Sequence, residues 1–239
     1  MPKASSFFLC ASLSVIVLMI ASTSVMSQST IFNIPSSDTL QRGSWGLEAD
    51  FVAKPTSYRT GGYQTYGYRV AYGLNNKTEL GTNFYYTWDG SVSAGQAEFS
   101  LKRKVYENER LGVVASAGVV AFVPLKSTAG DKTHTMVYAN ASKQIKQLNG
   151  LTVTGGVYHI LGGRGDFGTK TGAMVAVVQP INARFSLVAD WFSGKNRLGY
   201  ASAGFNLAVT KRQYLTTGYS FGNSGRGNNA LAAYYGFIF

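Results

Sequence analysis

The stretch TELGTNFYYTWD, residues 78–89, alternates between two kinds of side chain. Every second residue from Leu80 to Trp88 is apolar or β-branched, whereas the residues from Glu79 to Thr87 that lie between them are mostly polar or small. A period of two is typical of a β-strand, because successive side chains of a strand point to opposite faces. The stretch therefore predicts a strand over 78–88 with one apolar face and one polar face.

The same alternation, interrupted by turn residues, recurs from residue 44 to the C-terminus. Most of the segments have the length of about 9–11 residues that a tilted strand needs to cross a bilayer. The fifth to the eighth are weakly patterned, so that ten or fourteen strands are the alternatives to about twelve. The predicted strands are 44–53, 62–72, 78–88, 95–106, 111–123, 133–143, 151–161, 172–179, 184–193, 198–209, 213–221 and 229–239.

The connections between these segments alternate in length. Short turns such as 73–77 and 107–110 alternate with longer, glycine-rich loops such as 54–61 and 124–132, although 144–150 and 194–197 depart from the trend. Short turns at one rim and long loops at the other are typical of an outer-membrane barrel, in which both ends of the barrel lie at the short-turn rim. The pattern requires an even number of strands.

The charge content separates a membrane barrel from soluble alternatives. Charged residues make up 14% of the chain, whereas soluble domains carry about 25%. A secreted β-sandwich or a lipocalin-like barrel would point its apolar face inward and would need a charged exterior. The polar faces of the well-patterned strands carry too few ionisable residues for that. They are Glu48, Asp50, Arg69, Glu79, Glu98, Lys102, Lys104 and Asp190. We therefore predict an all-β fold, a transmembrane antiparallel up-and-down β-barrel over residues 44–239.

The N-terminus predicts export. Lys3 precedes the mostly apolar stretch 7–20, and Val25 and Ser27 fit the small-residue positions before a cleavage site. An uncleaved anchor is the alternative, but the apolar stretch is shorter than the roughly 18 residues of a spanning helix. We expect a cleaved signal peptide at 1–27 and an irregular periplasmic leader at 28–43, which could fold inward.

The C-terminus resembles a known signal. The chain ends Ala233-Tyr234-Tyr235-Gly236-Phe237-Ile238-Phe239, which is similar to the signal that the barrel-assembly machinery reads in bacterial outer-membrane barrels. Residues 72–81 are also similar in rhythm to porin-like proteins of uncharacterised function. The resemblance implies a location in a Gram-negative-type outer membrane and the assembly machinery as a partner. Its signal residues are Tyr235, Phe237 and Phe239. Three tryptophans near strand ends, Trp45, Trp88 and Trp191, suit an aromatic girdle.

The polar face of the strands would line the lumen. We expect passive passage of small solutes, with selectivity shaped by Arg69, Glu79, Glu98, Lys102, Lys104 and Asp190. The formal net charge of +11 resides mainly in turns and loops, where it can neutralise lipopolysaccharide phosphates. The alternative is a closed structural barrel that contacts lipopolysaccharide. The expected partners are membrane lipids, lipopolysaccharide and small solutes, and not nucleic acid, because the chain is exported. The sequence indicates neither the solute nor the oligomeric state.

Few motifs indicate catalysis. Residues 163–168, GRGDFG, have the spacing of a dinucleotide fingerprint but precede a strand rather than a helix. His134 and His159 lie near the same rim and could face each other as an acid–base pair or a metal site, unless a shift of one residue places them on opposite faces. Outer-membrane phospholipases carry a histidine and a serine two residues apart, and Met136 stands at that spacing here. We therefore predict no enzyme activity, no cofactor and no metal, with a rim enzyme as the third alternative.

Overall fold

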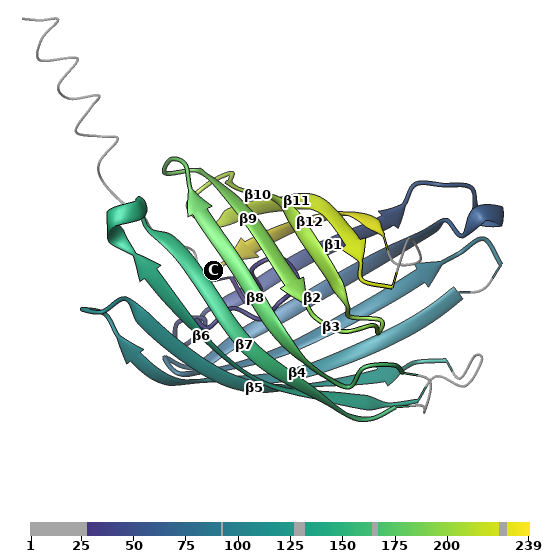
Figure 1. Ribbon diagram of the computed structural model, residues 1–239, viewed down its shortest axis with the longest axis horizontal. Helices are drawn as coiled ribbons and strands as arrows, with labels where there is room; N and C mark the ends of the chain where they lie inside the picture. Colours follow the sequence, from purple (N-terminus) through teal and green to yellow (C-terminus); the bar gives the residue numbers. More distant parts are fainter. Residues whose placement is uncertain (1–27, 92, 127–131, 164–166, 225–228) are drawn as a thin grey trace, which may run out of the picture.

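The protein is a closed barrel of twelve antiparallel strands (Figure 1). The computed structural model describes residues 28–91, 93–126, 132–163, 167–224 and 229–239, so that the expected signal peptide at 1–27 lies outside the described residues. Each strand pairs with its neighbours in sequence, and β1 pairs with β12. The strands are β1 Trp45–Lys54, β2 Tyr63–Asn75, β3 Thr78–Trp88, β4 Ser93–Asn108, β5 Val113–Pro124, β6 His134–Ile145, β7 Leu151–Gly162, β8 Thr171–Pro180, β9 Phe185–Phe192, β10 Tyr200–Ala208, β11 Gln213–Gly222 and β12 Ala230–Ile238. The predicted fold class and strand number are confirmed.

The two faces of each strand differ as the alternation predicts. In β3, Leu80, Phe84 and Tyr86 are exposed on the outside of the barrel, whereas Glu79 is buried on the inside. Many large apolar side chains are exposed on the described outer surface, whereas charged side chains such as Glu48, Glu79 and Lys102 are buried on the inner face. That is the reverse of a soluble barrel and suits a bilayer.

Several strands extend beyond their predicted ends, and in β2 and β4 a shift of the pairing accompanies the extension. β2 continues to Asn75 and β4 spans Ser93–Asn108, where the sequence predicted 62–72 and 95–106. The pairing shifts between Lys104 and Tyr106 in β4, and between Gly73 and Asn75 in β2. A bulge leaves one residue unpaired and moves the following side chains to the other face, which breaks the alternation that predicted the strand ends.

Both ends of the barrel lie at the short-turn rim. The backbone N–H of Trp45 donates to the carbonyl of Phe239 at 2.7 Å, and the N–H of Phe239 donates to the carbonyl of Trp45 at 2.9 Å. Two 3₁₀ turns, Tyr58–Thr60 and Lys146–Leu148, lie in connections between strands. Among the described residues, no helix is long and apolar enough to span a bilayer.

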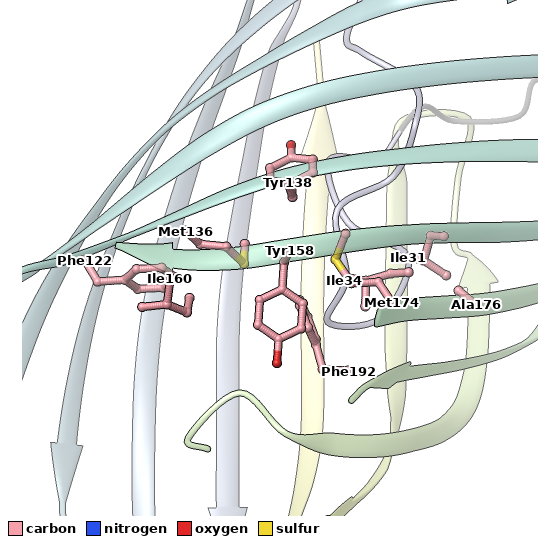
Figure 2. Packing of buried hydrophobic residues seen from close by; sticks show 10 residues of the cluster. All are labelled: Ile31, Ile34, Phe122, Met136, Tyr138, Tyr158, Ile160, Met174, Ala176 and Phe192. Atoms are coloured by element: carbon pink, nitrogen blue, oxygen red, sulfur yellow. The ribbon is translucent and has the colours of Figure 1, made fainter. Parts of the chain in front are cut away.

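The leader, residues 28–43, lies inside the barrel. Its apolar residues Ile31, Phe32 and Ile34 are buried, with Ile34 fully so. Ile31 and Ile34 lie beside Met174 and Ala176 of β8 (Figure 2). The cluster that they join is formed by Phe122, Met136, Tyr138, Tyr158, Ile160, Met174, Ala176 and Phe192. The leader therefore supplies part of the core that a barrel of this width needs in order to fill its interior.

Candidate functional site: the barrel lumen

A cavity of about 500 Å³ occupies the lumen beside the leader. Its lining reaches from residues at the long-loop rim, such as Thr87 and Pro124, to Glu79 and Lys102 deeper in the barrel. One side of the lining is polar and comes from β2, β3 and β4: Thr65, Arg69, Glu79, Asn83, Tyr85, Thr87, Gln96, Glu98, Ser100 and Lys102. The other side is largely apolar and comes from β5, β6, β9 and the leader: Phe32, Val120, Phe122, Met136, Tyr138 and Phe192. The cavity is therefore amphipathic.

Arg69 of β2 holds together a network of buried charges. Its guanidinium lies 2.9 Å from a carboxylate oxygen of Glu48 and 3.7 Å from one of Asp50. It also donates to the hydroxyl of Thr30 in the leader at 2.8 Å. Tyr85 donates to Asp50 at 2.9 Å. A planar guanidinium suits such a site, because its fork of donors serves several acceptors at once.

Lys102 forms the second buried ion pair. Its ammonium lies 3.2 Å from Glu79 and donates to the carbonyl of Ser29 and the hydroxyl of Ser36 in the leader. Lys104, two residues further along β4, lies 3.0 Å from both Asp38 and Glu107. Arg69, Glu79 and Lys102 line the cavity, whereas Lys104 ties the leader to the short-turn end of β4.

Glu98 lines the cavity in a different way. Its carboxylate accepts hydrogen bonds from the side-chain amides of Asn83 and Gln96, both at 2.8 Å. Arg197, in the loop between β9 and β10, donates to the amide oxygen of Gln96 at 2.6 Å. Among the described residues no basic group lies within 4.0 Å of the Glu98 carboxylate, in contrast to Glu79, which pairs with Lys102.

Asp190 of β9 binds the leader and does not line the cavity. Its carboxylate accepts the backbone N–H of Asn33 and, at 2.8 Å, that of Ile34. Asn33 also donates to Ser202 at 2.6 Å. Asn140 donates to the carbonyl of Pro35 at 2.6 Å. A charged acceptor with two backbone donors is among the stronger hydrogen-bond arrangements, so the leader is fixed to this wall.

The two histidines do not form a pair: of the two arrangements that the sequence left open, they adopt the one on opposite faces of the wall. His134 is buried inside the barrel, where its ring stacks on that of Phe122 with centroids 4.7 Å apart. His159 is exposed on the outer face and lies 2.6 Å from the hydroxyl of Thr171. The register pairs Val137 with His159 and His134 with Gly162, which places the rings on opposite faces. Among the described residues, no group of histidines, cysteines and carboxylates gathers for a metal.

The aromatic residues singled out from the sequence lie on the outside. Trp45 begins β1, Trp88 ends β3 and Trp191 lies one residue from the end of β9. Tyr235 and Phe239 are exposed on the outer face near the seam between β12 and β1. These positions suit a girdle and an assembly signal, and both roles are proposals. The loop motif at 163–168 lies partly outside the described residues.

The sequence did not predict the contacts that the leader makes with the wall of the lumen. Thr30, Asn33 and Pro35 bond to the barrel wall, and Asn140 completes the wall on β6. A signal for this was present: Ile31, Phe32 and Ile34 are apolar but belong to no predicted strand, so they needed burial elsewhere.

Comparison with known proteins supports the fold. No family model matches the sequence, and no curated protein matches it. An outer membrane channel from Pseudomonas putida F1 is similar in structure, with a TM-score of 0.53, 14% identity, and 85% of this chain and 98% of that chain covered. The fold is that of bacterial outer-membrane β-barrels.

Two further structures give lower scores. The outer membrane phospholipase of Salmonella typhi has a TM-score of 0.49 and 12% identity over 82% of this chain and 90% of that chain. The outer membrane protein Omp33 of Acinetobacter baumannii has a TM-score of 0.47 and 9% identity over 83% of this chain and 98% of that chain. At such identities the likeness concerns the fold alone.

Proposed function

We propose that the protein lies in the outer membrane of a Gram-negative-type cell, after export by a cleaved signal, and passes small solutes through its lumen. The closed barrel and its apolar outer face support this location. Membrane lipids surround the barrel in this proposal, and the assembly machinery reads Tyr235, Phe237 and Phe239.

The observation that carries the proposal is the cavity of about 500 Å³ in the lumen. A barrel with a purely structural role can fill its interior with apolar side chains, as small barrels do. Here Arg69, Glu98 and Lys102 line an internal space instead, at the desolvation cost that charged groups pay inside a protein. That cost is explained when the space admits water and polar solutes.

The leader limits passage in this proposal. It crosses the lumen and joins several parts of the wall through Thr30, Asn33 and Pro35. A solute that enters from the long-loop rim reaches the cavity first. It passes further through the lumen only when the leader is displaced. The resting barrel therefore has a narrow path, and displacement of the leader widens it.

Single-channel recording in planar bilayers tests the proposal. We expect small, discrete steps from the chain that begins at Gln28 and larger steps from a chain that begins at Ser44, because the second lacks the leader. Replacing Glu79 and Glu98 by glutamine is expected to change the reversal potential in a salt gradient. Silence from both chains, once each is shown to be folded and inserted, contradicts passage.

The closed structural barrel is the second candidate. The complete burial of Ile34 and the bonds between the leader and Asp190 favour it, because they give the leader a fixed place. In this case lipopolysaccharide contacts the basic residues of the long loops. Loss of lipopolysaccharide binding in a Lys195→Gln and Arg197→Gln double variant, together with an absence of conductance, would support it.

The hypothesis of a rim enzyme required His134 and His159 to form one site. These two residues lie on opposite faces of the barrel wall. We therefore propose a role without catalysis. The double change His134→Ala and His159→Ala tests it against any hydrolytic activity that is found.

A further inference from the structure

Carboxylates outnumber basic groups at the inward-facing positions of the strands. The inward-facing positions carry five carboxylates, Glu48, Asp50, Glu79, Glu98 and Asp190, against three basic groups, Arg69, Lys102 and Lys104. Glu48 and Asp50 share the single guanidinium of Arg69. The second carboxylate oxygen of Asp50 is buried without a hydrogen-bond partner. The cavity itself is lined by equal numbers of acidic and basic side chains, Asp50, Glu79 and Glu98 against Arg69, Lys102 and Arg197. The charge that a solute meets there therefore depends on how these groups are paired.

Asp50 and Glu79 each lie within 4.0 Å of a basic group, whereas among the described residues Glu98 does not. Asn83 and Gln96 each donate one neutral hydrogen bond to it and fix the orientation of the carboxylate. Arg197 donates to the amide oxygen of Gln96 and lines the cavity at its solvent-exposed end. Glu98 therefore presents a positioned negative charge to the cavity without an ion-pair partner among the described residues.

An aromatic ring lies directly beside this carboxylate. The sheet register pairs Glu98 with Asn83 on one side and with Phe122 on the other. Phe122 belongs to the apolar side of the cavity, which continues through Met136 and Tyr138. A group bound at Glu98 would thus have polar neighbours on β3 and an apolar surface on β5 and β6.

We propose that the cavity binds a small amphipathic organic cation, with its ammonium group at Glu98 and its aromatic body against Phe122 and Met136. The cavity volume of about 500 Å³ falls in the range of about 300–1,000 Å³ of small-molecule sites. The proposal names the solute class for the passage function and rests on it, since passage is the reason for a solute to enter the lumen.

The basic long loops do not reverse this preference. Lys54, Lys170 and Lys195 are solvent-accessible residues of the long-loop rim, and salt screens exposed charges over a distance of about 8 Å at physiological ionic strength. Charges inside the lumen are screened less. The loop lysines therefore affect the rate of approach, whereas Glu98 and Arg197 line the cavity and act on a bound solute.

Three probes of matched shape test the proposal on protein purified from outer membranes in detergent. Phenethylamine, 2-phenylethanol and phenylacetate differ mainly in charge. By titration calorimetry we expect phenethylamine to bind about tenfold or more tightly than either of the others, because only it pairs with a partly buried carboxylate. Equal affinity for the three probes, or preference for phenylacetate, would overturn the proposal.

Variants locate the site. Glu98→Gln keeps an acceptor for Asn83 and is expected to weaken phenethylamine about tenfold while leaving 2-phenylethanol unchanged. Glu109→Gln is the matched control, because Glu109 is an exposed carboxylate in a turn outside the cavity. Equal effects of the two variants contradict a site at Glu98. If Glu98→Gln does not fold, the comparison of the three probes on the natural protein still tests the preference for a cation.

Liposome swelling with the same three probes separates this inference from the passage function. Equal swelling rates with the three probes would refute the binding site and support the passage of solutes. Tight binding of phenethylamine without swelling would keep the binding site and refute passage.

Discussion

At the scale of single residues, inward-facing glycines explain how tyrosines fit in the lumen. Four of these glycines lie directly opposite a tyrosine of the neighbouring strand, and a Cβ built on each of them would collide with that ring. The pairs are Gly67 with Tyr85, Gly118 with Tyr138, Gly172 with Tyr158 and Gly236 with Tyr214. Because the ring occupies the space of the missing side chain, it lies along the wall and leaves room for the leader and the cavity.

A substitution at Gly118 tests this packing. An added Cβ would lie 2.5 Å from the ring of Tyr138, so we expect Gly118→Ala to lower the free energy of unfolding by about 1–3 kcal/mol, as overpacking does. Gly155→Ala is the control, because nothing lies within 4 Å of a Cβ built there. Urea unfolding in micelles measures both. Equal midpoints for the two variants would show that the ring moves aside freely.

At the scale of elements, the leader behaves as a thirteenth segment of the structure that pairs with no strand. Asn33 is attached to both β9 and β10, through Asp190 and Ser202. Its side-chain amide lies 2.6 Å from the hydroxyl of Ser202, and these two positions are therefore chosen for a disulfide test.

We expect the double variant Asn33→Cys and Ser202→Cys to conduct less when oxidised than when reduced, because the disulfide holds the leader in the lumen. The sequence contains one cysteine, Cys10, within the segment expected to be removed. Asn33→Cys alone serves as the control and should not respond to reductant. Single-channel recording with and without dithiothreitol measures the difference, and an identical conductance in both states would mean that the leader is no barrier.

The sequence predicts the strands and their faces better than it predicts which side chains contact one another. The alternation in 78–88 placed Glu79 inside and Leu80 outside, because the period of a strand assigns each side chain to a face. It did not pair Glu79 with Lys102, since that contact depends on the register between β3 and β4. The same holds for Glu98. The alternation predicts that its side chain faces the lumen, whereas its neighbours Asn83 and Phe122 depend on the registers of β4 with β3 and with β5. The burial of the leader depends on the space that the closed barrel leaves, which local patterns do not contain.

At the scale of the whole molecule, the seam between β1 and β12 closes the barrel. Eight residue pairs from Gly46 with Ile238 to Ala53 with Leu231 form this contact. Trp45 and Phe239 extend it by two further backbone hydrogen bonds. The seam joins residues from the two ends of the barrel sequence, so the last residue of the chain is part of its closure.

Deletion of Phe239 tests the contribution of the seam. Two backbone hydrogen bonds are lost, each with a net value of about 0.5–1.5 kcal/mol, so we expect the free energy of unfolding to fall by about 1–3 kcal/mol. Phe239→Leu keeps the backbone and should lose less. Urea unfolding in micelles compares the two, and an equal loss would assign the effect to the ring rather than to the backbone.

The position of the leader also constrains the order of assembly. Tyr234 of β12 donates to the side chain of Asn33 across a sequence separation of 201 residues. A chain segment enters an open curved sheet from the side, whereas a closed barrel admits it only through a rim. The leader is made first and its last contact is made by the final strand, so it can lie against the growing sheet before the edges meet. In that order of events, the leader occupies the interior before β1 and β12 pair and close the barrel.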